Sequence, residues 1–182
     1  MNKNRLKQKF KEGNIKAFNT VYDKYCDAMY TICLRYTKNT DEAADMLQDA
    51  FIKIHEKCDS FNPAYELGGW IKKIVVNTAI NHIRQNNKFD IVDSFESFEA
   101  TLEEPEIFRQ EDNSANIQDQ LIQILKEIPT GYQTVFNLFV FENLTHKEIA
   151  NYLEISENTS KTQLFKARKL ILKKLQDKKI LL

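Results

Sequence analysis

The chain has 182 residues, which is enough for one domain or two small ones. Hydrophobic residues make up 42% and charged residues 29%, an ordinary balance for a soluble globular protein, and the scarcity of Gly and Pro favours helices over turn-rich β structure. No apolar run is long enough to span a bilayer, and the basic N-terminus lacks the apolar core of a signal peptide, so we expect a cytoplasmic protein without membrane insertion.

The net charge is zero, but the charges are unevenly distributed along the chain. Residues 1–88 carry 15 Lys/Arg against 10 Asp/Glu (+5), residues 89–119 carry one against 10 (−9), and residues 120–182 carry 10 against 6 (+4). This pattern predicts two basic modules joined by an acidic connector. Because helical periodicity resumes at Ile117, we place the domain boundaries at 1–88, 89–116 and 117–182.

Apolar residues recur at threes and fours from residue 6 to residue 37, which predicts one or two helices. Gly13 and Asn14 mark a break between them. The stripe is wide and rich in aromatic residues, which is typical of a core face. It includes Phe10, Ile15, Phe18, Val21, Tyr22, Tyr25, Met29, Ile32, Cys33 and Tyr36.

The three cysteines, Cys26, Cys33 and Cys58, have no closely paired spacing, so we expect reduced, buried thiols. His55 and Cys58 are close enough to chelate a metal ion from one helix, but two ligands do not make a zinc site. We therefore expect no metal and no cofactor.

Asn39 to Glu42 has the character of a helix start, with two carboxylates in the first turn where they favour the helix dipole. The helix continues to about His55 with an apolar face toward the core. Asp45, Gln48, Asp49 and Lys53 lie on its other side. That side is either a solvated polar face or a docking surface for a protein partner.

A loop with Pro63 and the pair Gly68-Gly69 follows from Asp59, and the next helix is predicted from Trp70 to about Arg84. Aromatic side chains in the loop stand beside cationic ones in the helix. This combination suits single-stranded nucleic acid, whose bases stack on rings while lysines follow the phosphates. The alternative for Trp70 is packing in the core, the usual fate of a large aromatic side chain.

The acidic connector, residues 89–119, carries Phe89, Phe95, Phe98 and Phe108 among its acids. This composition is typical of a segment that is partly disordered without a partner. It is either a solvated linker or a mimic of nucleic acid that lies in a cationic channel.

Two amphipathic segments follow between residues 117 and 142, separated by Pro129, and two more lie between Leu144 and Leu175. Thr145 and Glu148 form a capping-box signature, and Ser156 can cap a second helix just after the break at Glu154. Asn143 and Asn158 are candidates for the left-handed conformation that Gly often supplies in such turns. A short helix, a tight turn and a longer basic helix indicate a helix-turn-helix.

At about 100° per residue, the last helix has two distinct faces. Its apolar face holds Ser160, Leu164, Ala167, Ile171 and Leu175. The opposite face suits a DNA major groove, with short polar side chains toward the N-terminus for base edges and lysines toward the C-terminus for phosphates. It holds Asn158, Thr159, Thr162, Lys166, Lys169 and Lys173, with Lys161 and Gln163 on its flanks.

Four motifs in this order resemble the bacterial RNA polymerase sigma factors of the sigma-70 family, in the compact extracytoplasmic-function group. The motifs are Asp45-Met-Leu-Gln-Asp-Ala-Phe51, Gly69-Trp-Ile-Lys-Lys-Ile-Val-Val-Asn77 with Asn81-His-Ile-Arg84, Ile128-Pro-Thr-Gly-Tyr-Gln-Thr-Val-Phe136, and Lys147-Glu-Ile-Ala-Asn-Tyr-Leu153 through Lys166-Ala-Arg168. The variant Thr159-Ser-Lys-Thr-Gln-Leu164 resembles sequences of the Bacteroidetes branch.

The resemblance implies an all-α fold of two small helical domains, sigma region 2 and the region 4 helix-turn-helix, joined by the acidic linker. It implies a core-polymerase contact through Asp45, Gln48, Asp49 and Phe51. It implies minus-ten DNA contacts and melting through Phe61, Tyr65, Trp70, Lys72, Lys73, Asn77, Asn81 and Arg84. It implies minus-thirty-five contacts through Asn158, Thr159, Lys161, Thr162, Gln163, Lys166, Arg168 and Lys169.

By the same resemblance the partners are core RNA polymerase, promoter DNA and an anti-sigma factor, with no small-molecule substrate, and the linker runs through the polymerase channel. Two departures are His82 and Gln163, which stand where the family often has an acidic residue and an Arg. A stand-alone helix-turn-helix regulator is the alternative function. We expect no enzyme, because the sequence has no Gly-rich phosphate loop and no nucleophile–base constellation.

Overall fold

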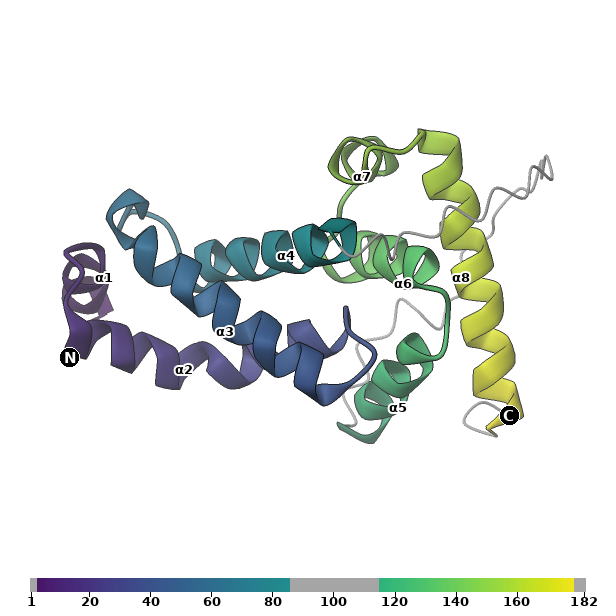
Figure 1. Cartoon of the computed structure of the whole chain (residues 1–182), viewed down its shortest axis with the longest axis horizontal. Helices are drawn as coiled ribbons and strands as arrows, with labels where there is room; N and C mark the ends of the chain where they lie inside the picture. The colour runs from purple at the N-terminus through teal and green to yellow at the C-terminus, as the bar shows by residue number, and fades with distance from the viewer. Residues whose placement is uncertain (1–2, 86–114, 179–182) are drawn as a thin grey trace. The chain divides into compact units, whose positions relative to one another are not determined.

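The computed structural model describes residues 3–85 and 115–178, which form helices and connecting loops without a strand (Figure 1). This confirms the predicted all-α fold. The chain divides into two compact units, Met1–Gln85 and Asn86–Leu182. The acidic connector up to residue 114, with its four phenylalanines, lies outside the described residues.

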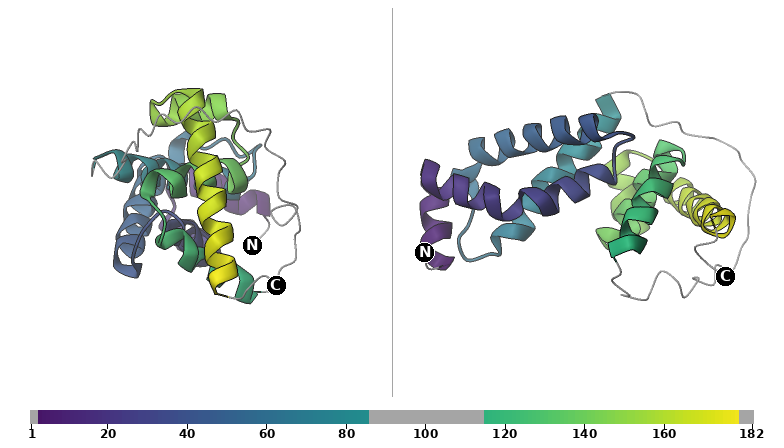
Figure 2. Two further views of the ribbon diagram at one scale, coloured as in Figure 1. Left: turned by 90° about the vertical axis from the view of Figure 1, so that its right-hand side faces the viewer. Right: turned by 90° about the horizontal axis from the view of Figure 1, so that it is seen from below.

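The first unit is built on three long helices that pack against one another, α2 (Ile15–Leu34), α3 (Thr40–Glu56) and α4 (Leu67–Gln85), as Figure 2 shows. The short helix α1 (Lys3–Lys11) packs against α2 and against the 3₁₀ turn η1 (Cys58–Ser60).

The predicted break between the first two helices is confirmed, and both of its residues have a local role. Gly13 has a φ of 71°, a left-handed conformation that is easy for glycine. Asn14 caps α2, because its side-chain oxygen accepts a hydrogen bond of 3.1 Å from the Ala17 amide. Asn39 caps α3 in the same way through the Glu42 amide, at 2.8 Å.

Three aromatic rings from separate segments meet in the core of the first unit. Phe10 of α1 lies edge-on to Phe61 at 6.0 Å and to Trp70 at 6.0 Å, and the last two rings are 5.4 Å apart. Phe10 and Phe61 are almost completely buried. Such pairs contribute stability beyond the area they bury, so this cluster fixes α1 and the loop before α4 to the bundle.

The start of α4 differs from the predicted one, because the helix begins at Leu67 and takes the glycine pair into its first turn. A Cβ on Gly68 would lie 3.1 Å from the Tyr25 ring, so the absence of a side chain allows close packing on α2. Gly68 therefore marks a close helix approach and not the end of a loop.

The predicted core stripe of residues 6–37 is only partly correct. Val21, Met29, Ile32 and Cys33 are buried, whereas Ile15 and Tyr22 are 69% and 41% exposed. Periodicity identifies an apolar face, but it does not show how much of that face another helix covers.

All three cysteines are free, and Cys33 and Cys58 are buried as expected, whereas Cys26 is only half-buried. Burial raises the pKa of the Cys33 thiol to about 12. Within residues 3–85 and 115–178 no three His, Cys, Asp or Glu side chains are grouped to hold a metal ion. No helix in these ranges combines the length and apolar character needed to cross a membrane.

The second unit consists of α5 (Ala115–Lys126), α6 (Thr130–Phe136) with its π-helical extension η3 (Asn137–Phe141), α7 (His146–Leu153) and α8 (Glu157–Asp177). Helices α5, α6 and α7 all pack against α8 (Figure 1). Glu127, just after α5, binds Lys174 at 2.7 Å and Lys178 at 2.6 Å, which ties α5 to the C-terminal half of α8.

We predict that the Glu127 contact makes the stability of the second unit sensitive to acid. Hydrogen bonds from Lys174 and then Lys178 hold the pKa of Glu127 below its usual value. A lowered carboxyl pKa stabilises the fold above the unfolded pKa of about 4.3, and this contribution is lost as the pH falls through the folded pKa. Glu127→Gln should therefore lower the free energy of unfolding at neutral pH by less than about 1 kcal/mol, because the pair is partly exposed.

Urea unfolding of the full chain and of the variant at neutral and acid pH measures this effect. The difference should vanish in acid, and Lys174→Met should show the same loss of pH dependence. A difference between the parent chain and Glu127→Gln that is undiminished in acid would contradict the prediction.

Candidate functional site

The second unit contains the predicted helix-turn-helix, and its capping interactions are those that the sequence indicated. The Thr145 amide donates to Glu148 Oε2 at 2.8 Å, and the Glu148 amide donates to Thr145 Oγ1 at 3.3 Å, which completes the capping box of α7. The Thr159 amide donates to Ser156 Oγ at 2.9 Å, so Ser156 caps α8.

The turn between α7 and α8 lies at the predicted break, Glu154, but the left-handed conformation of this residue was not predicted. Glu154 adopts a left-handed conformation with a φ of 58°, and Asn143 does so in the preceding loop with a φ of 53°. The expectation for Asn143 is confirmed, whereas the one for Asn158 is wrong because Asn158 is helical. The turn is therefore closed without a glycine, at a modest conformational cost to Glu154.

Helix α8 presents the two faces that its periodicity predicts. Ser160, Leu164, Ala167, Ile171 and Leu175 are all buried against the rest of the unit. On the other side Asn158, Lys161, Lys169 and Lys173 are exposed, and Thr159, Thr162 and Lys166 are half-exposed. The exposed face carries short polar side chains and Lys161 in its N-terminal half and further lysines beyond, which matches the chemistry of base edges and phosphates.

Two predicted contact residues, Gln163 and Arg168, lie inside the unit and not on this face. Gln163 is 2% exposed, and neither polar atom of its side chain has a hydrogen-bond partner. The Arg168 guanidinium lies 5.5 Å from the centre of the Phe139 ring, a cation–π contact between α8 and η3. In the free chain both side chains therefore serve the packing of α8.

His146 connects the two helices of the motif from the first residue of α7. Its ring stacks on Phe139 at 4.9 Å, and its Nδ1 shares a hydrogen bond of 2.9 Å with Ser160 Oγ of α8. Burial, followed by the positive charges of Lys161 and Arg168, lowers the pKa of His146. Neutral imidazole is thus the form that fits this position.

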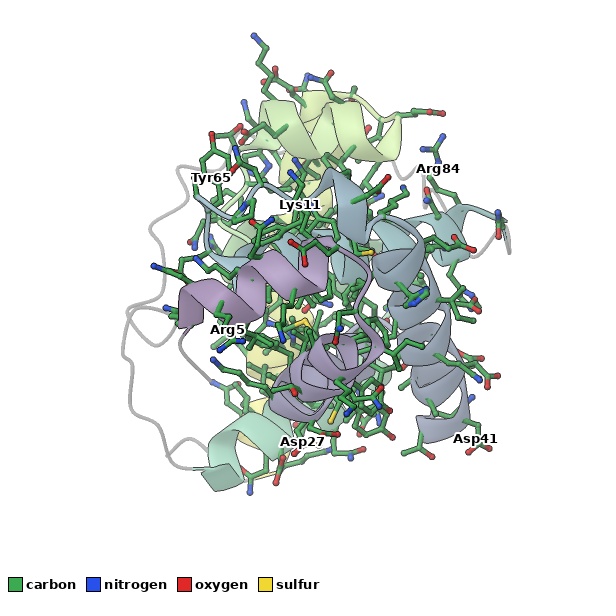
Figure 3. The ribbon with its side chains drawn as sticks, turned by 90° about the vertical axis from the view of Figure 1, so that its left-hand side faces the viewer. Arg5, Lys11, Asp27, Asp41, Tyr65 and Arg84 are labelled. Atoms are coloured by element: carbon green, nitrogen blue, oxygen red, sulfur yellow. The ribbon has the colours of Figure 1, made fainter. Side chains whose placement is uncertain are left out.

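The first unit carries an exposed acidic and apolar surface on α3, the helix whose start is marked by Asp41 in Figure 3. Asp45, Gln48 and Asp49 are exposed, as a docking surface requires. The fourth predicted residue, Phe51, is 4% exposed and packs edge-on to Tyr22 at 4.7 Å. Phe51 therefore packs beneath the exposed residues, between α3 and α2, and is not itself part of the exposed surface.

A groove of about 810 Å³ lies between α2 and α3 beside these residues. Its apolar side chains include Ile15, Tyr22 and Ile52, which are 69%, 41% and 51% exposed, and Glu56 also lines it. Exposed large apolar side chains that gather in one groove mark an interaction site. Ile52 was not identified from the sequence. A signal was available, because adjacent helical residues do not face the same side, so a residue next to the core residue Phe51 points to another side of α3.

The loop before α4 and the first turn of α4 hold the predicted aromatic residues in three different environments. Phe61 has no exposed surface, Trp70 is half-buried, and Tyr65 is 68% exposed. Figure 3 shows Tyr65 at the edge of the unit. Tyr65 is therefore the residue whose ring is available to stack on a base, whereas Phe61 belongs to the core.

Along α4 the six predicted contact residues divide between two sides of the helix. Trp70, Lys73, Asn77, Asn81 and Arg84 recur at intervals of three and four and so share one face. Lys72 lies roughly 160° around the helix from Trp70 and belongs to another face. The structure thus brings together five of these six residues in a stripe that begins at the aromatic loop.

Two family models match the chain. The model described as Sigma-70 region 2 matches residues 21–89, and the model described as Sigma-70, region 4 matches residues 118–171. RNA polymerase sigma factor SigV of Bacillus subtilis is 31% identical over 143 residues, which cover 78% of this chain and 81% of SigV. ECF RNA polymerase sigma factor SigW of the same organism is 28% identical over 184 residues, covering 97% and 98% of the two chains.

Two solved structures share the fold. CnrH, in complex with the cytosolic domain of CnrY, superposes with a TM-score of 0.52 at 18% identity, over 96% of this chain and 97% of that one. The sigma factor RpoE of Bartonella quintana, in complex with the anti-sigma factor NepR, superposes with a TM-score of 0.52 at 20% identity, over 89% and 98%.

We predict that His146 makes the helix-turn-helix less stable in mild acid. Because its pKa is lower in the folded chain, the unfolded chain binds the proton first, and stability falls as the pH drops below about 6.5, the ordinary pKa. His146→Gln removes this titration, so the variant should lose less stability than the parent chain between about pH 7.5 and pH 5. Thermal unfolding of both chains over this range measures it, and equal losses would contradict the prediction.

Proposed function

The chain belongs to the sigma-70 family, in the extracytoplasmic-function group of RNA polymerase sigma factors, and we propose that its two units bind core RNA polymerase and promoter DNA through the surfaces described above. The observation that carries the proposal is that one chain combines a region 2 unit and a region 4 helix-turn-helix. A stand-alone regulator would need only the second unit, and it would leave the first unit without a role.

The proposed division of labour follows the domains. Residues 1–88 act as region 2, residues 89–116 as the acidic linker, and residues 117–182 as region 4. The linker has a charge that suits the polymerase channel, because a channel built for an anionic transcript attracts a segment rich in Asp and Glu.

The proposed polymerase contact is the exposed side of α3 together with the groove beside it. Asp45, Gln48 and Asp49 form a polar, acidic edge, and Ile52 supplies an exposed apolar centre. Interfaces of this kind combine an apolar core with a polar rim. A helical segment of the polymerase clamp, the partner that the family resemblance implies, fits such a surface with apolar residues in the groove and cations at the edge.

The proposed minus-ten contact uses the exposed Tyr65 ring and the stripe on α4. Tyr65 stacks on an unpaired base of the opened promoter, and Lys73 and Arg84 follow the phosphates. Asn77 and Asn81 supply hydrogen bonds between them. Phe61 and Trp70 hold the loop in place, and Lys72 lies outside this stripe.

The proposed minus-thirty-five contact is the exposed face of α8 in a major groove. Asn158, Thr159 and Thr162 lie where base edges are read, and Lys161, Lys166 and Lys169 lie where phosphates pass. Gln163 and Arg168 contribute by keeping α8 in position, since both side chains are buried.

Regulation by an anti-sigma factor belongs to the same proposal. It is supported by the complexes in which CnrH and RpoE of Bartonella quintana were solved, one with the cytosolic domain of CnrY and the other with the anti-sigma factor NepR. The chain itself catalyses no reaction and needs no cofactor, because the polymerase synthesises the transcript. It binds the polymerase in the cytoplasm. The Thr159–Leu164 variant supports an origin in the Bacteroidetes branch.

Assembly with core polymerase tests the proposed docking surface. Ile52→Glu places a charge in the apolar groove and should weaken the affinity of the full chain for core enzyme by at least about tenfold, as truncating an interface centre does. Thr20→Glu adds the same charge to an exposed position on the opposite side of α2 and serves as the control. Equal affinities of the Ile52→Glu variant and the parent chain, measured by fluorescence anisotropy, would remove the groove from the interface.

We predict that Thr162→Ala and Lys166→Ala each weaken promoter binding, by different mechanisms. Loss of a base contact at Thr162 should cost about 1–3 kcal/mol on promoters with the recognised minus-thirty-five sequence. Loss of a phosphate contact at Lys166 should weaken binding to all sequences and reduce its salt dependence. Holoenzyme affinity for matched and mutated minus-thirty-five fragments at two salt concentrations separates the two effects, and an unchanged affinity for both variants would move the reading face elsewhere.

A further inference from the structure

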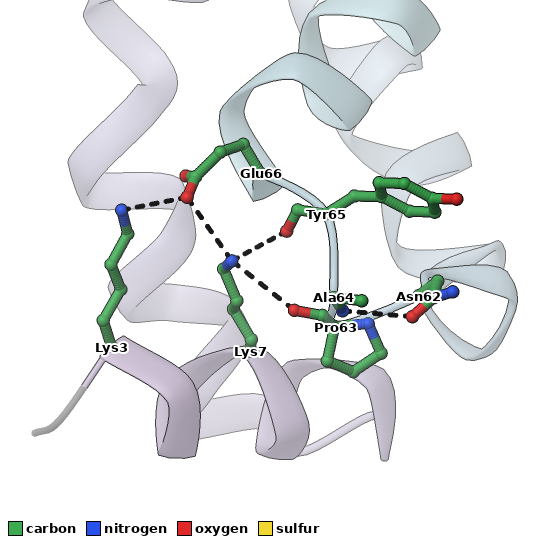
Figure 4. Close-up of polar contacts among 7 residues, drawn as sticks. All are labelled: Lys3, Lys7, Asn62, Pro63, Ala64, Tyr65 and Glu66. Atoms are coloured by element: carbon green, nitrogen blue, oxygen red, sulfur yellow. Dashed lines mark hydrogen bonds and ion pairs between the residues drawn. The ribbon is translucent and has the colours of Figure 1, made fainter.

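Lys7 is a nearly buried lysine whose ammonium group is directed at the loop that carries Tyr65. Its side chain is 8% exposed. Its Nζ donates to the Tyr65 carbonyl oxygen at 2.7 Å and to the Pro63 carbonyl oxygen at 3.5 Å, and it lies 3.6 Å from a carboxylate oxygen of Glu66 (Figure 4). An ammonium group has three donors and no acceptor, so these three oxygen atoms satisfy it.

A second lysine on the same helix, Lys3, makes an exposed contact with the same carboxylate. Lys3 lies one turn before Lys7 and binds the same Glu66 carboxylate at 3.2 Å (Figure 4). Its side chain is 61% exposed, so this ion pair is screened by water and contributes little. The buried Lys7 contact is therefore the one that fixes the loop.

Helix α1 also holds the loop from the inside. Phe10 is one turn beyond Lys7 on the same side of α1 and packs on Phe61, the residue at which the loop begins. Within the loop, Asn62 accepts hydrogen bonds at 3.0 Å from the Ala64 amide, through its side chain, and from the Tyr65 amide, through its carbonyl (Figure 4 shows the first). The loop thus has a defined turn that α1 holds at both ends.

This arrangement constrains the backbone of Tyr65 and leaves its ring free. The carbonyl of Tyr65 is bound by Lys7, whereas the residue is 68% exposed. A ring that is held out before it meets its ligand loses less conformational entropy on binding than a ring on a mobile loop. Helix α1 lies before the region 2 match, which begins at residue 21.

We propose that Lys7 is a positioning residue for promoter opening: it holds the Asn62–Glu66 loop so that Tyr65 is presented to the unpaired minus-ten strand. The inference rests on the proposed function, because it takes Tyr65 as the base-stacking residue. It adds that α1, through one buried charge, sets the affinity of the holoenzyme for opened DNA. Lys7 itself touches no nucleotide.

The test uses the full chain assembled with core polymerase and a promoter fragment on which this holoenzyme starts transcription. The fragment is prepared fully paired and with the minus-ten region held open by mismatches. Lys7→Met keeps the apolar stem and removes the ammonium group, and Lys7→Arg keeps a donor. Lys3→Met removes the exposed contact to Glu66 and serves as the matched control.

Lys7→Met should lower holoenzyme affinity for the opened fragment about tenfold, a part of what loss of one stacked base costs. Its affinity for core polymerase should not change, Lys7→Arg should recover at least part of the loss, and Lys3→Met should behave as the parent chain. In a Tyr65→Ala background Lys7→Met should have no further effect, because a residue that acts only through another shows this non-additivity.

Several results would overturn the inference, and they differ from failure of the proposed function. If Lys7→Met lowered core binding as much as DNA binding, Lys7 would be a structural residue only. Additive effects of Lys7→Met and Tyr65→Ala, or a Tyr65→Ala variant with full affinity for opened DNA, would also refute it while the holoenzyme still directed transcription. If the parent chain directed no promoter-specific transcription, the proposed function would fail, and this inference with it.

Discussion

The packing of Phe10 against Phe61 and Trp70 is the contact on which the first unit depends. It joins the N-terminal helix to the loop and the start of α4, which lie far from that helix in the sequence. Because the rings of Phe10 and Phe61 are buried, the loop has a fixed position and Tyr65 is left at the surface. A core interaction therefore determines which aromatic side chain of the loop is available to nucleic acid.

In the second unit a single helix, α8, has both a core role and a DNA-binding role. Helix α8 must pack against three other helices and also present a face to DNA. Its periodicity separates the two tasks, with Leu164 and Ile171 inward and Thr162 and Lys169 outward or at the boundary. Gln163 and Arg168 show how wide the inner face is, because polar residues next to the apolar stripe are buried with it.

Local features were predictable from the sequence, and contacts between distant segments were not. The caps at Thr145 and Ser156 and the break at Gly13 involve neighbouring residues, so they can be recognised in the sequence without knowledge of the tertiary structure. The exposure of Ile15, Tyr22 and Ile52 depends on how helices pair, and the contact between Lys7 and Tyr65 spans 58 positions. Periodicity identified the faces of the helices but could not show which of them would remain uncovered.

We propose that one chain joins core polymerase and selects promoters with two separate units. Adding the purified full chain to bacterial core RNA polymerase and transcribing genomic fragments tests this proposal. We expect transcripts with defined start sites that are absent with core enzyme alone. Tight binding of the chain to duplex DNA without polymerase, together with no stable complex with core enzyme, would contradict the claim and favour a stand-alone regulator.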